Sequence, residues 1–220
     1  MLPPPELKAR VLSRIRALPS PARREANLRR RIFVACGLLI PLLAFVAVGG
    51  ARPGPRPSLL MLETGAGALV LAASSLWVVL GGGRMLGRSR SALLSVVAFW
   101  PVSLFLWKLA CSATALSSGA MLVWPTRPGL NCFGLTLLLG SWPLFALALT
   151  RRRSDPTHPL SLGAALGVSA GSYAALLVDM WCPVGYPWHV LLGHVVPILL
   201  IGLVGMAVGY FGLALRQDDE

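Results

Sequence analysis

The sequence predicts an all-α integral membrane protein with six transmembrane helices and both termini in the cytoplasm. Three observations support this fold class. First, the 220-residue chain contains six largely apolar blocks, each close to the roughly 20 residues of helix that span a hydrocarbon core about 30 Å thick. Second, only 13% of the residues are charged and the mean hydropathy is +0.71, too apolar a composition to cover a water-soluble domain. Third, the basic residues concentrate in alternate connections.

Helix breakers separate the six blocks. Proline and glycine cluster where the apolar runs end, for example at residues 52–57, 81–83 and 125–129. The predicted spans are Ile32–Val48, Leu59–Leu80, Ala92–Ala110, Leu130–Leu149, Leu160–Met180 and Val190–Leu215. The chain is therefore expected to have three regions, a basic N-terminal tail (1–31), a six-helix transmembrane domain (32–215) and a short C-terminal tail (216–220).

The basic residues predict the orientation of the spans. Sixteen of the 20 Lys and Arg residues fall in the two terminal tails and in the second and fourth connections. The remaining four are Arg52, Arg56, Lys108 and Arg127. Because cytoplasmic loops carry an excess of Lys and Arg, this distribution places both termini in the cytoplasm. The same topology explains the net charge of +12, so no direct nucleic-acid partner is expected.

The N-terminal tail contains a short amphipathic segment. Its apolar residues recur at helical spacing, while lysine and arginine occupy the other faces. These candidate partner-binding residues are Leu7, Val11, Leu12, Ile15 and Leu18. A helix of three turns is marginal alone and orders on another surface. That surface is either anionic membrane lipid or a partner protein.

Three of the four cysteines are predicted at the outer ends of helices. Cys111 follows the third span, Cys132 lies at the start of the fourth and Cys182 follows the fifth. On the predicted topology all three face the outer compartment, which is oxidising in a bacterial cell. Two of them could form a structural disulfide or a redox- or metal-responsive pair, or could simply pack. The chain has no Cys-x-x-Cys motif and no His/Cys spacing of a closed zinc site. No catalytic residue, metal ligand or cofactor is therefore predicted.

Several other polar and small residues carry expectations. His189 is expected in a surface loop, and His194 is expected to pack within a helix with one hydrogen bond. Lys108 and Asp179 enter the ends of apolar spans, where a charge must pair, reach water or snorkel. The glycines are spaced for close packing between helices, at Gly163, Gly167, Gly171, Gly205 and Gly209.

Two other functions, a membrane thiol oxidoreductase and a small transporter, fit the sequence less well. A thiol oxidoreductase is disfavoured by the missing Cys-x-x-Cys motif. A small transporter normally carries ionisable groups or broken helices near the bilayer midplane, whereas these span interiors are almost wholly apolar apart from proline and glycine. The chain is therefore not expected to be an enzyme, and a transporter remains the weaker alternative.

The second half of the chain resembles a known family. Asn131-Cys132-Phe133-Gly134, the run Arg151-Arg152-Arg153, the glycine ladder and the pairs Trp181-Cys182 and Trp188-His189 are similar to the NrsF-type bacterial membrane anti-sigma factors. Members of that family have six spans, with one cysteine before the fourth and another after the fifth. Two departures are Trp181, where histidine was expected, and the absence of a His-x-x-x-Cys-x-x-Cys motif from the tail.

The resemblance implies a function. It implies a multi-pass protein of the bacterial inner membrane that sequesters an extracytoplasmic-function sigma factor and releases it on an envelope, oxidative or light-linked signal. Cys132 and Cys182 match the cysteine pair of the family. The short basic tail and the composition also resemble a myxobacterial anti-sigma factor of the light response, which is linked to carotenoid synthesis. Thirty-one residues cannot form a sigma-binding domain with its own core, so the Leu7–Leu18 segment would make the contact.

Overall fold

The computed structural model describes residues 6, 13, 20–47, 49, 58–80, 89–113, 127–151, 157–182, 184 and 186–213. Every regular element among these residues is helical. The elements are α2 (Ser20–Ala47), α3 (Ser58–Leu80), α4 (Arg90–Ala113), α5 (Arg127–Arg151), α6 (Pro159–Trp181), α7 (Pro187–Val190), the π-helix η1 (Leu191–Val195), α8 (Val196–Val208) and the π-helix η2 (Gly209–Leu213).

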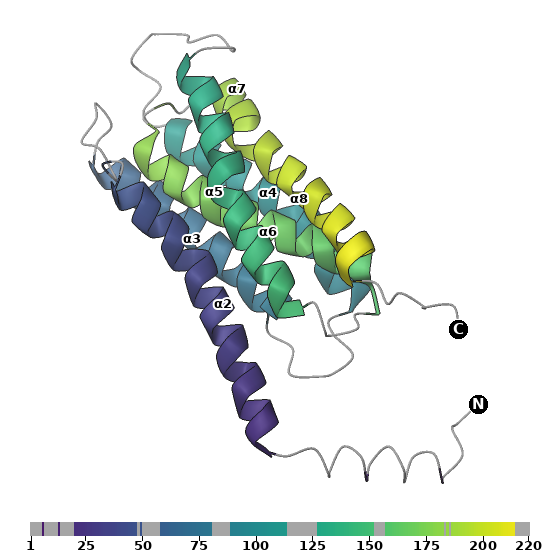
Figure 1. Cartoon of the computed structure of the whole chain (residues 1–220). Helices are drawn as coiled ribbons and strands as arrows, with labels where there is room; N and C mark the ends of the chain where they lie inside the picture. The colour runs from purple at the N-terminus through teal and green to yellow at the C-terminus, as the bar shows by residue number, and fades with distance from the viewer. Residues whose placement is uncertain are drawn as a thin grey trace.

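Six helical stretches are long and apolar enough to cross a membrane, which confirms the predicted number. They are Leu28–Ala47, Leu62–Leu80, Arg90–Cys111, Gly129–Arg151, Pro159–Trp181 and Pro187–Leu213. The last is one continuous run made of α7, η1, α8 and η2. The helices pack side by side as an elongated bundle (Figure 1).

Helix α2 extends beyond the rest of the bundle at one end (Figure 1). It has 28 residues and is therefore about 42 Å long at 1.5 Å per residue. Pro21 lies in its first turn, where the missing N–H removes no helical hydrogen bond. Consequently residues 20–31 and the first span form one uninterrupted helix.

Helix α6 is the centre of the bundle. Every residue from Leu162 to Asp179 except Tyr173 is buried. Its neighbours are α8, α5, α3 and α4. Such complete burial requires small residues on several faces, and α6 supplies alanine, glycine and serine throughout.

The predicted close packing of the glycines is confirmed between α6 and α8. A Cβ added at Gly167 would overlap the carbonyl oxygen of Ile201, and one at Gly205 would overlap the carbonyl oxygen of Gly163. At Gly171 the added atom would lie 2.9 Å from the Cα of Ile198. Backbone atoms cannot move aside as a side chain can, so these positions hold the two helices at a separation that only glycine permits.

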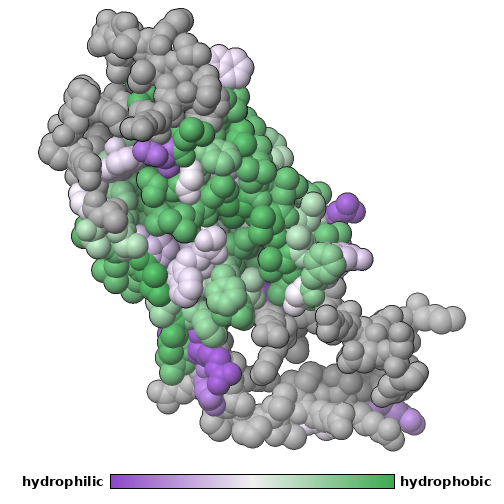
Figure 2. Space-filling model, turned by 45° about the horizontal axis from the view of Figure 1, so that its top comes forward, coloured by the Kyte–Doolittle hydropathy of each residue, from purple (hydrophilic) through white to green (hydrophobic). Residues whose placement is uncertain are grey.

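The outer surface of the bundle is apolar. Figure 2 shows hydrophobic residues over most of the middle of one face. Large apolar side chains are exposed on the peripheral helices, including Leu43, Trp77, Phe99, Leu138 and Phe211. A surface of this kind is stable in lipid and would aggregate in water, in agreement with six membrane spans.

Helix α2 docks on the bundle around an internal proline. Pro41 lacks an N–H, so the ladder of helical hydrogen bonds is interrupted at this turn. The carbonyls on either side of Gly37, whose own carbonyl would pair with the N–H of residue 41 in a regular helix, accept bonds from other helices: Trp142 Nε1 donates to Cys36 O at 3.3 Å, and Tyr173 Oη donates to Leu38 O at 2.6 Å. In lipid, backbone acceptors must find such donors within the protein.

Two arginines bind the last carbonyls of α3. Arg30 Nη2 on α2 donates to Leu80 O at 2.7 Å, and Arg151 Nη2 on α5 donates to Val79 O at 2.7 Å. The carbonyls at a helix C-terminus have no helical partner and carry partial negative charge, which guanidinium groups neutralise. We call this part of the bundle the arginine end. The opposite end, which holds Cys132 and Cys182, is called the thiol end.

Candidate functional site

Two cysteines and two histidines converge at the thiol end. Cys132 lies on α5, Cys182 directly follows α6, His189 lies on α7 and His194 on η1. Their ligand-type atoms, the two sulfurs and one ring nitrogen from each histidine, all lie within 4.8 Å of one another. All four side chains are buried, with 4% or less of their surface exposed. We call these four residues the Cys/His cluster.

Helix ends position the two cysteines. Cys132 lies in the second turn of α5, and its carbonyl accepts a hydrogen bond from Thr136 Oγ1 at 2.8 Å. Cys182 is the C-cap of α6, and its N–H donates to Val178 O at 2.9 Å. Its extended backbone ends the helix and directs the chain toward α7. The two thiols therefore meet although 50 residues separate them in the sequence.

A π-helical turn brings the two histidines together. They are five residues apart, a spacing that would place them about 140° apart around an α-helix. The π-helix η1, Leu191–Val195, has hydrogen bonds between residues five apart and so widens the turn. Pro197 follows it at the second position of α8, where its ring would clash with a regular preceding turn. The rings of His189 and His194 consequently lie edge to face at 5.5 Å.

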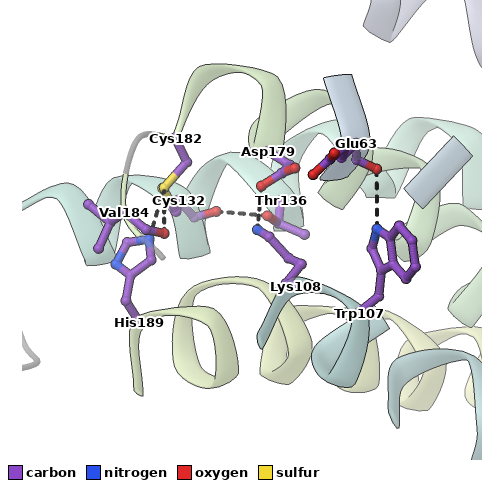
Figure 3. A network of polar contacts seen from close by, with 9 residues as sticks. All are labelled: Glu63, Trp107, Lys108, Cys132, Thr136, Asp179, Cys182, Val184 and His189. Carbon is purple, nitrogen blue, oxygen red and sulfur yellow. Dashed lines mark hydrogen bonds and ion pairs between the residues drawn. The ribbon is translucent and has the colours of Figure 1, made fainter. Parts of the chain in front are cut away.

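The cluster is closely packed. Cys182 Sγ lies 3.0 Å from His189 Nε2, and Figure 3 shows the two side chains pointing toward each other. A Cβ at Gly193 would lie at ordinary contact distance, 3.5 Å from the Cβ of Cys132 and 3.7 Å from Cε1 of His189, so η1 packs directly against the cluster. His194 is completely buried, and neither of its ring nitrogens makes a hydrogen bond of standard geometry with a described residue.

The contacts of Cys182 favour its thiolate form. Cys182 lies between the fifth and sixth spans, and the neighbouring Cys132 thiol holds the pKa of Cys182 below its ordinary value. The hydrogen bond with His189 acts in the same direction, whereas burial opposes both. The thiolate is the form of cysteine that binds metal ions and reacts as a nucleophile.

A buried ion pair lies beside the cluster. Lys108 on α4 pairs with Asp179 on α6, one turn before Cys182, and both side chains are 3% exposed. In Figure 3 the two cysteines lie on one side of this ion pair and Trp107 lies on the other. Trp107 Nε1 donates a hydrogen bond to Glu63 O. Of the three alternatives expected for a charge at the end of a span, namely pairing, contact with water or snorkelling, Lys108 and Asp179 adopt pairing.

The structure brings together some of the sequence-predicted candidates and separates others. Cys132 and Cys182 meet, and no disulfide links any of the four cysteines, all of which are in described positions. Cys111 is half-buried near the end of α4 and does not belong to the cluster. The candidate partner-binding residues, Leu7, Val11, Leu12, Ile15 and Leu18, lie outside the described residues.

The two histidines correct the sequence analysis. His189 is 4% exposed, so the expectation of a surface loop is wrong. The short helix α7 folds back onto the bundle and buries it. His194 packs within the helical run as expected, but without the expected hydrogen bond of standard geometry to a described residue. Pro197 is the one sequence signal near them, because a proline inside a helix disturbs the preceding turn, but it does not by itself predict that the two rings meet.

Comparison with known proteins supplies the family. The family NrsF, negative regulator of sigma F, matches residues 17–214. No curated protein and no solved structure matches this chain. The matched region includes α2, all six spans and the whole Cys/His cluster. The match covers far more than half of the sequence, and the family is regulatory rather than enzymatic. The chain therefore belongs to the NrsF family of negative regulators of a sigma factor.

Proposed function

We propose that this protein is an inner-membrane anti-sigma factor that binds an extracytoplasmic-function sigma factor through its N-terminal tail and releases it when the thiol end responds to a signal. The observation that supports this most strongly is the family match over residues 17–214. It makes the chain a negative regulator of a sigma factor, and the six apolar helices place that regulator in a membrane.

Binding by the tail follows from the sequence and from the start of α2. Leu7, Val11, Leu12, Ile15 and Leu18 form one apolar face in a segment too short for a core of its own. A groove on a sigma factor would cover this face as amphipathic helices are covered in other complexes. The tail leads directly into α2, whose first residue is Ser20. Anionic lipid is the competing surface for the same face.

An orientation with both termini in the cytoplasm would bring the tail into the compartment of the sigma factor. Most basic residues lie in segments that the positive-inside rule assigns to the cytoplasm. Arg30 and Arg151, which bind the end of α3, lie at that same end of the bundle. The Cys/His cluster then lies toward the periplasm, where oxidants and metal ions arrive first.

Direct contacts link the two ends of the molecule. Helix α5 carries Cys132 near its start and contacts α2 further along, where a Cβ at Gly37 would lie 2.7 Å from the Cβ of Ala146. Helix α6 leads to Cys182 and donates the Tyr173 hydrogen bond to α2. A change in the packing of α5 or α6 at the thiol end would therefore displace α2 and alter the presentation of the tail. Release needs several kcal/mol of differential affinity between the two states.

The tail is tested by co-purification of the sigma factor. Leu12→Asp with Ile15→Asp places two charges on the apolar face, and we expect recovery of the sigma factor to fall about tenfold or more and sigma-dependent transcription to rise. Ala9→Asp with Ser13→Asp is the matched control, because it adds the same charge on the opposite helical face. Equal recovery with both double variants would remove the tail from the mechanism.

Sensing is tested with serine variants of the cysteines. Cys132→Ser and Cys182→Ser are expected to abolish the response to the signal while the protein still inserts into the membrane. Cys111→Ser should keep the response, because Cys111 lies outside the cluster. Peroxide, envelope stress and illumination are compared in one reporter strain. The active signal is the one whose transcriptional response is lost in the cluster variants. A response that survives both cluster variants would exclude thiol sensing.

A further inference from the structure

The donor set of the Cys/His cluster is that of a metal site. Two thiols and two imidazoles are the ligands of closed tetrahedral zinc sites. The sequence analysis predicted no metal ligand because the four residues lie in four different elements, without the spacing of a local zinc motif. The fold brings them within 4.8 Å of one another. We propose that Cys132, Cys182, His189 and His194 bind one Zn²⁺ ion.

The separation of the donors fits such an ion. Zinc lies about 2.3 Å from a thiolate sulfur and about 2.0–2.1 Å from an imidazole nitrogen, which places the donors of a tetrahedral site about 3.3–3.8 Å apart. Cys182 Sγ and His189 Nε2 are already 3.0 Å apart. The widest pair in the cluster is at 4.8 Å, so closing the site requires shifts of about 1 Å or less in side chains that face each other.

The charge of the occupied site suits its surroundings. An ion of charge +2 with two thiolates and two neutral imidazoles is electrically neutral, and the neighbouring ion pair of Lys108 and Asp179 is neutral as well. A buried site of zero net charge avoids the large cost of placing an isolated charge in an apolar medium. Binding exchanges the thiol protons for the metal ion, so affinity should fall as the pH is lowered.

His194 provides an independent indication of a missing ligand. It is completely buried, and neither ring nitrogen makes a hydrogen bond of standard geometry with a described residue. A buried ring nitrogen without a well-formed hydrogen bond destabilises the folded protein. Its position beside the other three donors means that a metal ion would satisfy one of these nitrogens directly.

The ion would join separate parts of the bundle. Cys132 belongs to α5, Cys182 ends α6, and the histidines belong to the segment that leads into α8. One zinc ion would therefore join the start of α5 to the connection between α6 and α8, the two helices with the most extensive contact. This proposal concerns binding alone, so it stands or fails independently of any sigma factor.

The metal content of the purified protein tests the site. The full chain is purified in detergent with a tag that contains no histidine, supplied with Zn²⁺, dialysed and measured by elemental analysis. We expect about one zinc ion per chain in the wild type and a loss of most of it in Cys182→Ser and His194→Ala. Cys111→Ser is the matched control and should keep its zinc, because it removes a thiol near the same end that lies outside the cluster.

Two further measurements distinguish the loss of a metal ligand from misfolding of the variant. Zinc at one hundred times its Kd should raise the apparent Tm of the metal-free wild type by roughly 5–10 °C and leave the Tm of His194→Ala unchanged. His194→Cys preserves a fourth ligand. With Co²⁺ as the probe, this variant should retain a tetrahedral visible spectrum with stronger thiolate charge transfer than the wild type.

Two results would overturn the proposal. One is a wild type that binds no more zinc than Cys182→Ser after the same dialysis. The other is zinc binding that persists undiminished in both Cys182→Ser and His194→Ala, since the ion would then be held elsewhere.

Discussion

Helices α6 and α2 are both apolar, yet the protein surrounds them very differently. Within an apolar 18-residue stretch of α6, 89% of the residues are buried, against 17% in a stretch of the same length in α2. Glycine, alanine and serine let α6 contact neighbours on all sides, whereas α2 presents large side chains such as Leu43 to the outside. Helix α6 is therefore packed on all sides, whereas α2 lies at the periphery of the bundle and packs mainly against α5.

The two helices are therefore suited to different roles, α6 to holding the bundle together and α2 to changing its position. A helix fixed by backbone contacts on several faces cannot shift without disturbing its neighbours. Helix α2 packs mainly against α5, and Tyr173, Trp142 and Arg30 add hydrogen bonds between α2 and its neighbours. Since α2 is also the helix that continues into the tail, a helix that is packed on one side is suited to the signal transmission proposed above.

The largest effect is expected when the contact between α6 and α8 is filled. Gly167→Leu would drive a side chain into the backbone of Ile201 and Gly202, so we expect no accumulation of folded protein. Gly134→Leu is the matched control, because a Cβ at this glycine of α5 meets no atom within 4 Å. Monodisperse protein in size-exclusion chromatography measures the outcome. Normal folding of Gly167→Leu would show that α6 is not the fixed centre described above.

The second effect concerns the buried ion pair that anchors α6 to α4. Lys108→Met or Asp179→Leu alone leaves one buried charge without its partner and should lower the free energy of unfolding by about 3–5 kcal/mol. The double variant removes both charges and should be close to the wild type. Denaturant or thermal unfolding in detergent measures the cycle. If the double variant were as unstable as the sum of the single ones, the pair would not account for the loss.

Much of this architecture could be predicted from the sequence. Hydrophobic blocks of sufficient length predict the six spans because lipid imposes a helix on any such segment. The Gly163, Gly167 and Gly171 ladder predicts close helix packing because the spacing keeps all three on one face. The cost of an isolated charge in an apolar environment predicts that Lys108 and Asp179 pair, reach water or snorkel, but the sequence does not say which of these occurs.

The Cys/His cluster could be predicted only in part. The cysteines were recognised because they end neighbouring spans. His189 and His194 were not, since a five-residue spacing points to different faces of an ordinary α-helix, and η1 is not apparent from composition. The sequence does not show which of the three outer cysteines meet, because that depends on how the helices pack. In the structure Cys132 and Cys182 meet, and Cys111 lies outside the cluster.

The smallest expected effect tests the attachment of α2 itself. Tyr173→Phe removes the hydroxyl that donates to Leu38 O at 2.6 Å and leaves the ring in place. Hydrogen bonds between membrane helices contribute about 0.6 kcal/mol on average, so overall stability should hardly change. Local opening of α2 near Pro41 should become about threefold more frequent, which hydrogen exchange in nanodiscs can measure. Tyr210→Phe, at an exposed position on η2, is the control. Unchanged exchange in α2 would mean that its attachment depends on the Gly37 and Arg30 contacts, and transmission through α6 would then have to be abandoned in favour of α5.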